Sequence, residues 1–417
     1  MRDGWSTAKL GGVCQMIKRG IAPKYTENGG VCVINQKCVR DHKVNYELAR
    51  RHDIGRKGIN EERYIQVGDV LVNSTGTGTL GRVAQIRKKP TELTTVDTHV
   101  TICRPVPEKF FEAFFGYMLI KIEDEITSSG EGASGQTELA RTTLENKFEV
   151  SFPHSLSEQK RIVAILDEAF AGIDKAIVNT QQNLANAREL FESYLNSIFT
   201  QKGDGWHYGE LADIGGDIRT GPFGSLLHKS DYIDNGTPLI NPAHINAGLI
   251  IPDMRKTVDS EALDRLSNYR VKIGDVIIGR RGEMGRCAAI TEVEEGWLCG
   301  TGCFIISSKN NNEAEFIALL LSSNFYKEEI TKLASGATML NLSNEALGSL
   351  TVSLPSPKDQ ILILQQIKEV TNDQIKLNQL YKQKLTALTE LKQSLLTKAF
   401  SGELTADELP IKKEATV

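Results

Sequence analysis

The 417-residue sequence lacks long apolar runs and a regular set of cysteines. No apolar run approaches the roughly 20 residues needed to span a membrane, and the N-terminus lacks the apolar core of a signal peptide. The seven cysteines are odd in number and irregularly spaced, which argues against a disulfide framework. We therefore expect a cytoplasmic protein with no membrane partner, whose cysteines are reduced core residues.

Motifs for nucleotide binding and methyl transfer are also missing. Gly76 and Gly81 have the spacing of a phosphate-binding loop, but Arg82 and Val83 follow where that loop needs lysine and a hydroxyl residue. We interpret the stretch as a tight β-turn. Residues 241–244 (NPAH) come close to an amino-methyltransferase signature, but lack the aromatic residue that stacks a flipped base. Neither stretch therefore indicates catalysis.

A metal site is equally unsupported by the sequence. Cys299 and Cys303 could hold a metal together with histidine, but no second Cys or His pair lies at ligand spacing. Their apolar surroundings favour a core strand. We therefore predict a chain that is not an enzyme and that binds no metal or cofactor.

Neither sign of charge is in large excess, since 49 Lys and Arg stand against 53 Asp and Glu, which gives a formal net charge of −4. This argues against a protein that binds nucleic acid through bulk charge alone. The distribution is uneven, because residues 1–106 hold 18 Lys and Arg against 10 Asp and Glu, whereas residues 206–290 hold 10 against 11. The first segment therefore has a charge suited to phosphates, and the second does not.

Proline is absent between Pro153 and Lys202, and this stretch has the pattern of a long helix. Ser155 is a suitable N-cap, and Glu158 can complete a capping box. Apolar residues then recur at alternating steps of four and three, which is typical of a coiled-coil seam. The predicted seam consists of Leu166, Phe170, Ile173, Ile177, Thr180, Leu184, Ala187, Phe191, Tyr194 and Ile198.

The same signal returns about 201 positions later, with Ser356 matching Ser155 and Asp359 matching Glu158. Pro357 stands at the first helical position, where its missing N–H costs nothing. A repeat of this length indicates two tandem copies of one unit. The apolar stripe of the second helix is predicted to be Ile367, Val370, Leu377, Tyr381, Leu385, Leu388, Leu391 and Leu395.

A globular segment precedes each helix, and the two segments share one order of elements. Trp5 opens the first and Trp206 the second, and a glycine turn with a strand follows at 67–73 and at 273–279. The side chains between the matching elements diverge, which suggests two modules that recognise different things. We predict an α+β fold, with two similar mixed α/β domains separated by two long antiparallel coiled-coil helices in a pseudo-twofold internal repeat. The predicted parts are domain 1 at 1–154, helix 1 at 155–203, domain 2 at 204–355, helix 2 at 356–402 and a C-terminal tail at 403–417.

The pattern resembles the specificity subunits of type I restriction-modification systems over essentially the whole chain. The resemblance is carried by Pro153 with residues 158–167 (EQKRIVAILD), by 391–402 (LKQSLLTKAFSG), and by 219–232 (RTGPFGSLLHKSDY) followed by 236–240. The sequence departs from it in helix 2, where Gln374 and Asn378 stand at positions matching Ile173 and Ile177. The seam of helix 2 is therefore expected to be more polar there.

The resemblance implies a non-catalytic DNA reader. Each target-recognition domain would recognise one half of a bipartite, asymmetric target in double-stranded DNA. The two helices would set the spacing and dock methyltransferase subunits, two in number, and restriction subunits would join through the complex. S-adenosylmethionine, ATP and magnesium would belong to those partner subunits.

Basic residues in loop-like stretches are the candidates for DNA contact, because arginine suits guanine edges and both arginine and lysine suit phosphates. An alternative function is a stand-alone coiled-coil interaction protein with duplicated binding domains, in which these charges are only solvated. The candidates in the first domain are Lys18, Arg19, Lys37, Arg40, Arg50, Arg51, Arg56 and Lys57, and those in the second are Arg219, Lys229, Arg255, Lys256, Arg280 and Arg281.

Overall fold

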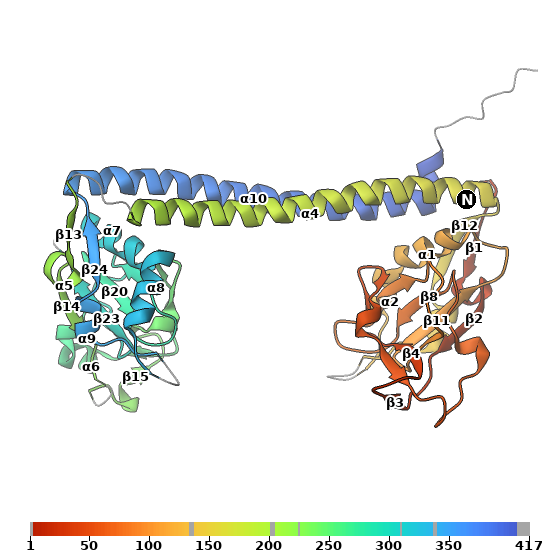
Figure 1. Ribbon diagram of the computed structural model, residues 1–417, viewed down its shortest axis with the longest axis horizontal. Coiled ribbons are helices and arrows are strands. Elements are labelled where there is room, and N and C mark those ends of the chain that lie inside the picture. The colour runs from red at the N-terminus through yellow and green to blue at the C-terminus, as the bar shows by residue number, and fades with distance from the viewer. Residues whose placement is uncertain are drawn as a thin grey trace, which may run out of the picture. The chain divides into compact units, whose positions relative to one another are not determined.

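The computed structural model describes residues 3–132, 137–200, 205–223, 226–308, 311–336 and 340–406. The chain divides into two units, unit 1 with Met1–Thr180 and Gln383–Val417, and unit 2 with Gln181–Lys382. Each unit holds one globular domain and a part of both long helices (Figure 1). Of the predicted tail at 403–417, residues 407–417 lie outside the described part.

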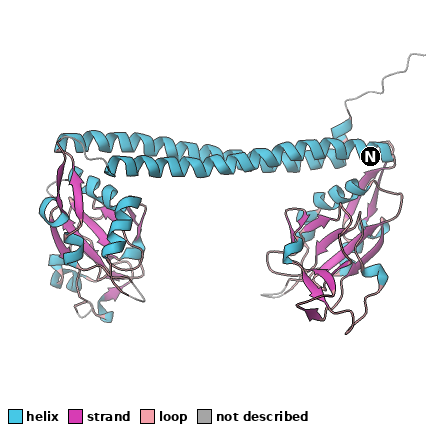
Figure 2. Cartoon of the chain, viewed as in Figure 1, coloured by secondary structure: helices cyan, strands magenta, loops and turns pink. Residues whose placement is uncertain are grey.

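Two helices of 45 residues each dominate the helical content, α4 at Leu156–Thr200 and α10 at Pro357–Ser401 (Figure 2). The backbone N–H of Glu158 donates to Ser155 Oγ at 3.4 Å, and that of Asp359 donates to Ser356 Oγ at 3.3 Å. The predicted N-caps are therefore confirmed. The predicted seam of α4 is also confirmed, because each of its residues is buried or half-buried.

The predicted seam of α10 is wrong at two positions. Leu377 is 37% exposed and Leu391 is 46% exposed. Lys392 lies in the seam instead, where its Nζ donates to Asp174 of α4 and lies 5.2 Å from the centroid of the Phe170 ring. A lysine stem covers apolar surface while its ammonium is paired, so a polar residue serves here as a seam residue. The half-buried polar residues of this stripe are Gln374, Asn378 and Lys392.

The domain of unit 1 contains two four-stranded sheets. The central sheet is antiparallel, and its apolar strands are buried on both faces: Val70 and Val72 face one core, and Leu71 faces a second core. The central sheet has the order β2 (Cys14–Arg19), β11 (Val100–Pro105), β8 (Val70–Asn73) and β9 (Val83–Gln85). The second sheet has the order β10 (Thr94–Val96), β4 (Val31–Ile34), β7 (Arg50–His52) and β3 (Tyr25–Thr26), with β10 parallel to β4.

Short helices fix this domain to the ends of the long helices. On α1, Phe114 lies 5.2 Å from Phe400 of α10 between ring centroids, and both are buried. Ile162 and Leu166 of α4 join the same core. The remaining elements are α1 (Glu112–Lys121), α2 (Glu123–Ser128), α3 (Arg141–Asn146), the ladder of β1 (Trp5–Lys9) with β12 (Glu149–Pro153), and the hairpin of β5 (Val39–Arg40) with β6 (Lys43–Val44).

The domain of unit 2 repeats this plan. Its central sheet has the order β14 (Asp217–Thr220), β23 (Cys303–Ser307), β20 (Asp275–Gly279) and β21 (Cys287–Ala289). Its second sheet has the order β15 (Tyr232–Ile233), β19 (Thr257–Val258), β16 (Thr237–Ile240) and β22 (Leu298–Cys299). The other elements are α5 (Leu211–Ile214), α6 (Ser260–Arg265), α7 (Asn311–Ser322), α8 (Asn324–Leu333), α9 (Asn344–Gly348), the ladder of β13 (His207–Glu210) with β24 (Thr351–Leu354), and the hairpin of β17 (Ile245–Asn246) with β18 (Leu249–Ile250).

Some individual contacts recur at equivalent positions of the two units. Asp69 Oδ2 accepts a hydrogen bond from the backbone N–H of Gln66 at 2.9 Å, and Asp275 Oδ2 accepts one from Lys272 at the same distance. The ring of Phe199 on α4 lies 5.4 Å from that of Phe316 on α7, and the equivalent rings of Phe400 and Phe114 lie 5.2 Å apart. The predicted fold class, two similar mixed domains with two long helices, is confirmed. Among the described residues, no helix is long and apolar enough to cross a bilayer.

Candidate nucleic-acid interface

Most of the predicted basic residues of unit 1 are paired with carboxylates of their own domain. Lys18 Nζ lies 2.6 Å from Glu62 Oε1, and Arg19 Nη1 lies 2.6 Å from Glu138 Oε1. Arg19 also donates to the carbonyl of Leu139 at 2.7 Å. A cation whose charge is balanced nearby attracts a phosphate less than a free one does. The further pairs are Arg40 with Asp41 at 3.7 Å and Arg56 with Asp53 at 3.3 Å.

Arg51 is the most tightly held of these cations. Its guanidinium donates to both carboxylate oxygens of Glu92, at 3.1 and 2.6 Å, and to the carbonyls of Gly29 and Gly30 at 2.6 and 3.0 Å. The hydrogen bonds from Arg51 hold the pKa of Glu92 below its ordinary value. Arg51 therefore ties the loop before β4 to β7, and each of its three guanidinium nitrogens donates to an acceptor of the domain.

Arg50, next to it on β7, has a different environment. Its Cζ lies 3.4 Å from the ring centroid of Tyr25 on β3. Partial burial, and then the carboxylate of Asp97, raise the pKa of Tyr25, so the ring stays a neutral phenol. Arg50 and Arg51 line one shallow cavity of about 520 Å³ together with Tyr25. Three predicted residues of unit 1 have no carboxylate partner in the described part of the chain: Lys37, Arg50 and Lys57.

Sequence reasoning missed Tyr25 as part of this cluster. The pairing of β3 with β7 sets Tyr25 opposite His52 and Thr26 opposite Arg51. That pairing joins stretches about 25 residues apart, and no local pattern in the sequence predicts it. The aromatic ring in a basic loop stretch was the one available signal, because arginine stacks well on aromatic faces.

In unit 2 two of the predicted cations, Arg219 and Arg255, have hydrogen-bond or ion-pair partners within the domain. Arg219 donates to the carbonyl of Asn268 and to Ser307 Oγ at 3.0 Å each, and it lies 3.8 Å from Asp275 Oδ2. Arg255 Nε lies 2.9 Å from Asp253 Oδ1. The other predicted cations have no carboxylate partner among the residues that the structure describes: Lys229, Lys256, Arg280 and Arg281.

A pair of equivalent hairpins carries different chemistry in the two units. Asp41 and His42, at the tip of β5–β6, have φ of 51° and 57°, and Ala247 and Gly248, at the tip of β17–β18, have φ of 48° and 78°. Two positive φ values at a two-residue tip define a type I′ turn. The first hairpin is basic, with Arg40 and Lys43 beside the tip, whereas the second exposes Leu249. Sequence analysis predicted neither hairpin.

The predicted residues are thus only partly brought together. Arg50 and Arg51 share a cavity, and Arg280 and Arg281 follow β20 as neighbours. Arg40 lies on the β5–β6 hairpin. The remaining residues either form sequence-adjacent pairs (Lys18 with Arg19, Arg56 with Lys57, Arg255 with Lys256) or stand singly, as Lys37, Arg219 and Lys229 do.

The glycine-rich stretch, the cysteine pair and the NPAH stretch, which the sequence analysis interpreted as structural, lie in a turn, in the core and in a short 3-10 turn. The stretch from Gly76 to Gly81 forms the turn between β8 and β9, as predicted. Cys299 on β22 and Cys303 on β23 are buried in the core, as predicted, and burial raises the pKa of both thiols. Residues 242–244, within the NPAH stretch, form a short 3-10 turn.

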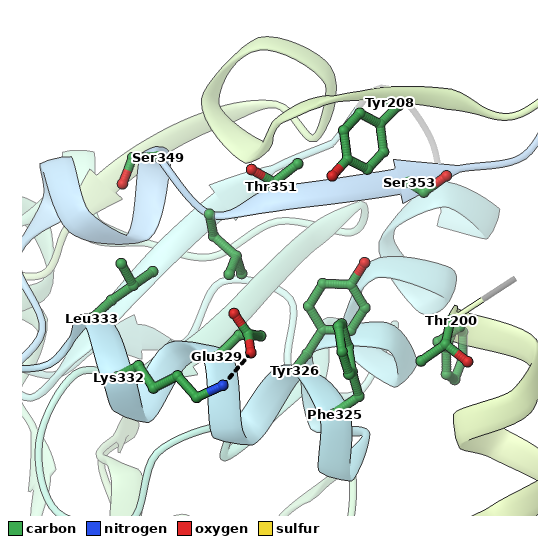
Figure 3. Close-up of a pocket in the computed structure, with 12 residues that line it drawn as sticks. Thr200, Tyr208, Phe325, Tyr326, Glu329, Lys332, Leu333, Ser349, Thr351 and Ser353 are labelled. Atoms are coloured by element: carbon green, nitrogen blue, oxygen red, sulfur yellow. Dashed lines mark hydrogen bonds and ion pairs between the residues drawn. The ribbon is translucent and has the colours of Figure 1, made fainter. Parts of the chain in front are cut away.

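Two cavities lie at equivalent places. Each lies at the C-terminal end of a long helix, where that end packs against the domain of the same unit. In unit 2 a cavity of about 360 Å³ lies between the end of α4, helix α8 and strand β24. Figure 3 shows Phe325 and Tyr326 beside it, with Lys332 paired to Glu329 at 2.6 Å. In unit 1 a cavity of about 260 Å³ lies between the end of α10, the α1–α2 junction and β12. The same construction thus occurs once per unit.

The chain matches one family model twice. The model described as the type I restriction modification DNA specificity domain matches residues 2–184 and 203–387. The two matches together cover most of the chain, and each ends inside a long helix, at residue 184 in α4 and at residue 387 in α10.

Individual relatives agree with this match. The type I restriction enzyme MjaVIII specificity subunit of Methanocaldococcus jannaschii is 21% identical over 281 residues, 63% of this chain and 64% of that protein. The alignment therefore spans less than two thirds of that relative. The MjaX specificity subunit of the same organism is 23% identical over 398 residues, 88% of this chain and 87% of that protein. A solved chain from a study of complex assembly and conformational transition of the type I R-M system has a TM-score of 0.76 at 18% identity, covering 97% of this chain and 99% of that one.

Proposed function

The chain belongs to the type I restriction modification DNA specificity family, and from this membership we propose that it reads a bipartite, asymmetric DNA target, one half-site per domain. One observation carries the proposal. The two units share the same sheets, buried aspartate turns and helix ends, yet differ in the side chains at equivalent exposed positions. A common framework with different exposed side chains is suited to reading two different half-sites.

The subunit is non-catalytic, and its role in the complex is recognition. All fourteen predicted basic residues remain our candidates for DNA contact. We propose that those without a carboxylate partner in the described chain contribute most of the affinity for phosphates. Cations already paired within a domain contribute less, because binding DNA would require them to exchange one partner for another.

We further propose that two methyltransferase subunits dock on the long helices, one at each end. The equivalent cavities at the ends of α4 and α10 support this, because each unit offers the same combination of helix end, short helix and strand. Exposed apolar side chains beside the cavity of unit 2, Phe325 at 41% and Leu333 at 38%, fit a protein partner. S-adenosylmethionine, ATP and magnesium would bind to the partner subunits, restriction subunits would join through this complex, and the whole complex would act in the cytoplasm.

Mapping of methylated adenines in cells tests the proposed function. A strain that expresses the chain with its methyltransferase subunit should gain methylation at one motif, made of two fixed half-sites around an unspecified gap. A strain with the methyltransferase subunit alone should lack that motif. The chain should also co-purify with that subunit. If the chain neither co-purifies with it nor changes the methylation map, the alternative of a stand-alone interaction protein is favoured.

A further inference from the structure

Arg280 and Arg281, directly after β20 in unit 2, are two neighbouring guanidinium groups without a carboxylate partner in the described chain. Most other arginines of this domain are paired, for example Arg255 with Asp253 and Arg286 with Glu283. Two like charges side by side repel each other, and they are stable together only if something opposes that repulsion. A protein that leaves such a pair without a carboxylate has room there for an anionic or hydrogen-bond-accepting ligand.

The backbone of the pair is fixed from two sides. The N–H of Arg280 donates to the carbonyl of Gly302 at 2.8 Å, and the carbonyl of Arg280 accepts from the N–H of Leu342 at 2.9 Å. Arg281 pairs with Asn341 in an isolated β-bridge, and its Nε lies 3.3 Å from Asn341 Oδ1. The two side chains therefore start from a rigid position.

The side chain of Arg280 is oriented as well. Its Cζ lies 5.2 Å from the ring centroid of Phe304, and its Nε is buried with no hydrogen-bond partner in the described chain. Burial, and then the charge of Arg281, lower the pKa of Arg280. A guanidinium that is held against a ring and left without acceptors is prepared to donate to a ligand.

The equivalent place in unit 1 shows that the fold does not require these arginines. The N–H of Ser74 donates to the carbonyl of His99 at 2.8 Å, and the carbonyl of Ser74 accepts from Leu139 at 2.8 Å, so the backbone bonds are the same. The hydroxyls of Ser74 and Thr101 bond to each other there, at 2.5 Å. In unit 1 the side chain at this position thus has a hydrogen-bond partner in its own domain, whereas in unit 2 the Nε of Arg280 has none in the described chain.

We propose that Arg280 reads a guanine in the half-site of unit 2 and that Arg281 contacts an adjacent phosphate. The proposal rests on the proposed function and adds to it a specific base and a specific reader. An arginine with a fixed fork matches the O6 and N7 acceptors of guanine in the major groove. The more exposed Arg281 is suited to a phosphate, which carries no sequence information. Unit 1 has no such reader at this position, so the two half-sites should differ here.

The test uses the full chain assembled with its methyltransferase subunit and duplexes that vary the target one base pair at a time. Arg280→Met keeps an apolar stem against Phe304 but removes the fork. It should lose discrimination at one G·C pair of one half-site by roughly 5- to 150-fold, and leave the other half-site and the gap unchanged. Arg281→Ala should weaken all duplexes equally and lower the salt dependence by about 0.9 of a slope unit.

Arg286→Ala is the matched control, because Arg286 lies at the other end of the same β20–β21 connection and is already paired with Glu283. It should keep the wild-type preference and salt slope. Thermal melting of each variant complex shows whether it is folded, and Arg280→Gln provides a second variant if the methionine variant melts early. Wild-type discrimination at every position in a folded Arg280 variant overturns the inference. A uniform loss of affinity with a lower salt slope in that variant also overturns it, since Arg280 would then contact a phosphate. Absence of sequence preference in the wild-type complex would instead refute the proposed function itself.

Discussion

At the residue scale, two adjacent arginines have opposite roles. Successive residues of a strand point to opposite faces, so Arg50 meets the ring of Tyr25 while Arg51 meets Glu92. The sequence predicted both as basic candidates on equal terms. It could not separate them, because the partner of each comes from a distant stretch of chain.

The difference predicts separate outcomes for two single variants. Arg50→Ala should lower the salt slope of DNA binding by about 0.9, since Arg50 has no carboxylate ion pair in the described chain. It should also lower the free energy of unfolding by about 0.5–1 kcal/mol, because its stack on the Tyr25 ring is lost. Arg51→Ala should keep most of the salt slope. It should lower the free energy of unfolding by roughly 1 kcal/mol, because its pair with Glu92 is partly exposed. Binding titrations between low and moderate salt, together with urea unfolding, measure both quantities. An unchanged slope in the Arg50 variant would place that residue away from the DNA.

At the element scale, a buried glutamine fixes the start of each long helix on its domain. Gln159 donates to the carbonyl of Pro153 at 2.9 Å, and its Oε1 accepts from the N–H of Phe111 at 2.7 Å. Gln360, 201 positions later, donates to the carbonyl of Pro355 at 3.1 Å, but its Oε1 is buried without a partner in the described chain. The side-chain amide of Gln159 thus both donates and accepts a hydrogen bond, whereas among the described residues that of the equivalent Gln360 only donates.

The two glutamines form a matched pair for mutation. Gln159→Met should cost roughly 2–3 kcal/mol of unfolding free energy, because it leaves the N–H of Phe111 and the carbonyl of Pro153 unpaired. Gln360→Met should cost less, about 1 kcal/mol or below, since it also removes an unsatisfied acceptor. Urea titration followed by hydrogen exchange, read separately in α1 and α7, assigns each loss to its unit. Equal losses of unfolding free energy in the two variants would contradict the different roles assigned to Gln159 and Gln360.

The long helices were the most predictable elements, and their limits have a physical cause. Apolar residues at steps of three and four positions predicted α4 and its whole seam, because every seam residue except Thr180 is apolar. On α10 the same reasoning selected Leu377 and Leu391, which are exposed. Which residues of α10 are buried depends on the residues of α4 that face them. Asp174 of α4 accepts a hydrogen bond from Lys392, so a lysine is favoured at this position over a leucine. The hairpin tips and the place of Tyr25 depend on long-range pairing and were beyond sequence reasoning.

At the scale of the whole molecule, the internal repeat implies that one half can replace the other. Phe199 matches Phe400, 201 positions later, and each packs on the equivalent phenylalanine of its own domain, Phe316 or Phe114. Leu195 likewise matches Leu396 in the two cores. A second copy of α4 could therefore supply what α10 supplies to unit 1.

A fragment ending at Lys202 should dimerise, since each copy then offers its Phe199 to the Phe114 of the other. With methyltransferase subunits the dimer should read a palindrome made of the first half-site twice. Sedimentation at micromolar concentration measures the association. Phe199→Ala in the fragment should weaken it by at least tenfold, as expected for truncating a buried aromatic. Val178→Ala, at a position 61% exposed on α4, serves as the control and should leave the association unchanged. A monomeric wild-type fragment would contradict the equivalence of the halves.

Both long helices continue from one unit into the other, since the boundary falls after Thr180 in α4 and after Lys382 in α10. If these helices set the distance between the half-sites, no base contact is needed to fix the gap. Each helix has 45 residues, which gives a length of about 67 Å at 1.5 Å per residue. The unspecified gap of the target should then follow helix length alone.

Inserting four residues at both boundary points tests this dependence directly. Four helical residues add about 6 Å and turn the helix by about 40° beyond one full turn. One DNA base pair adds about 3.4 Å and turns the duplex by roughly 35°, so one or two added base pairs keep both half-sites nearly in register. Methylation mapping should therefore show the original half-sites with a gap longer by one or two base pairs. Helicity of the purified variant and its co-purification with the methyltransferase subunit show that it is folded. A folded variant that methylates changed half-site bases across the original gap would refute helix length as the determinant of spacing.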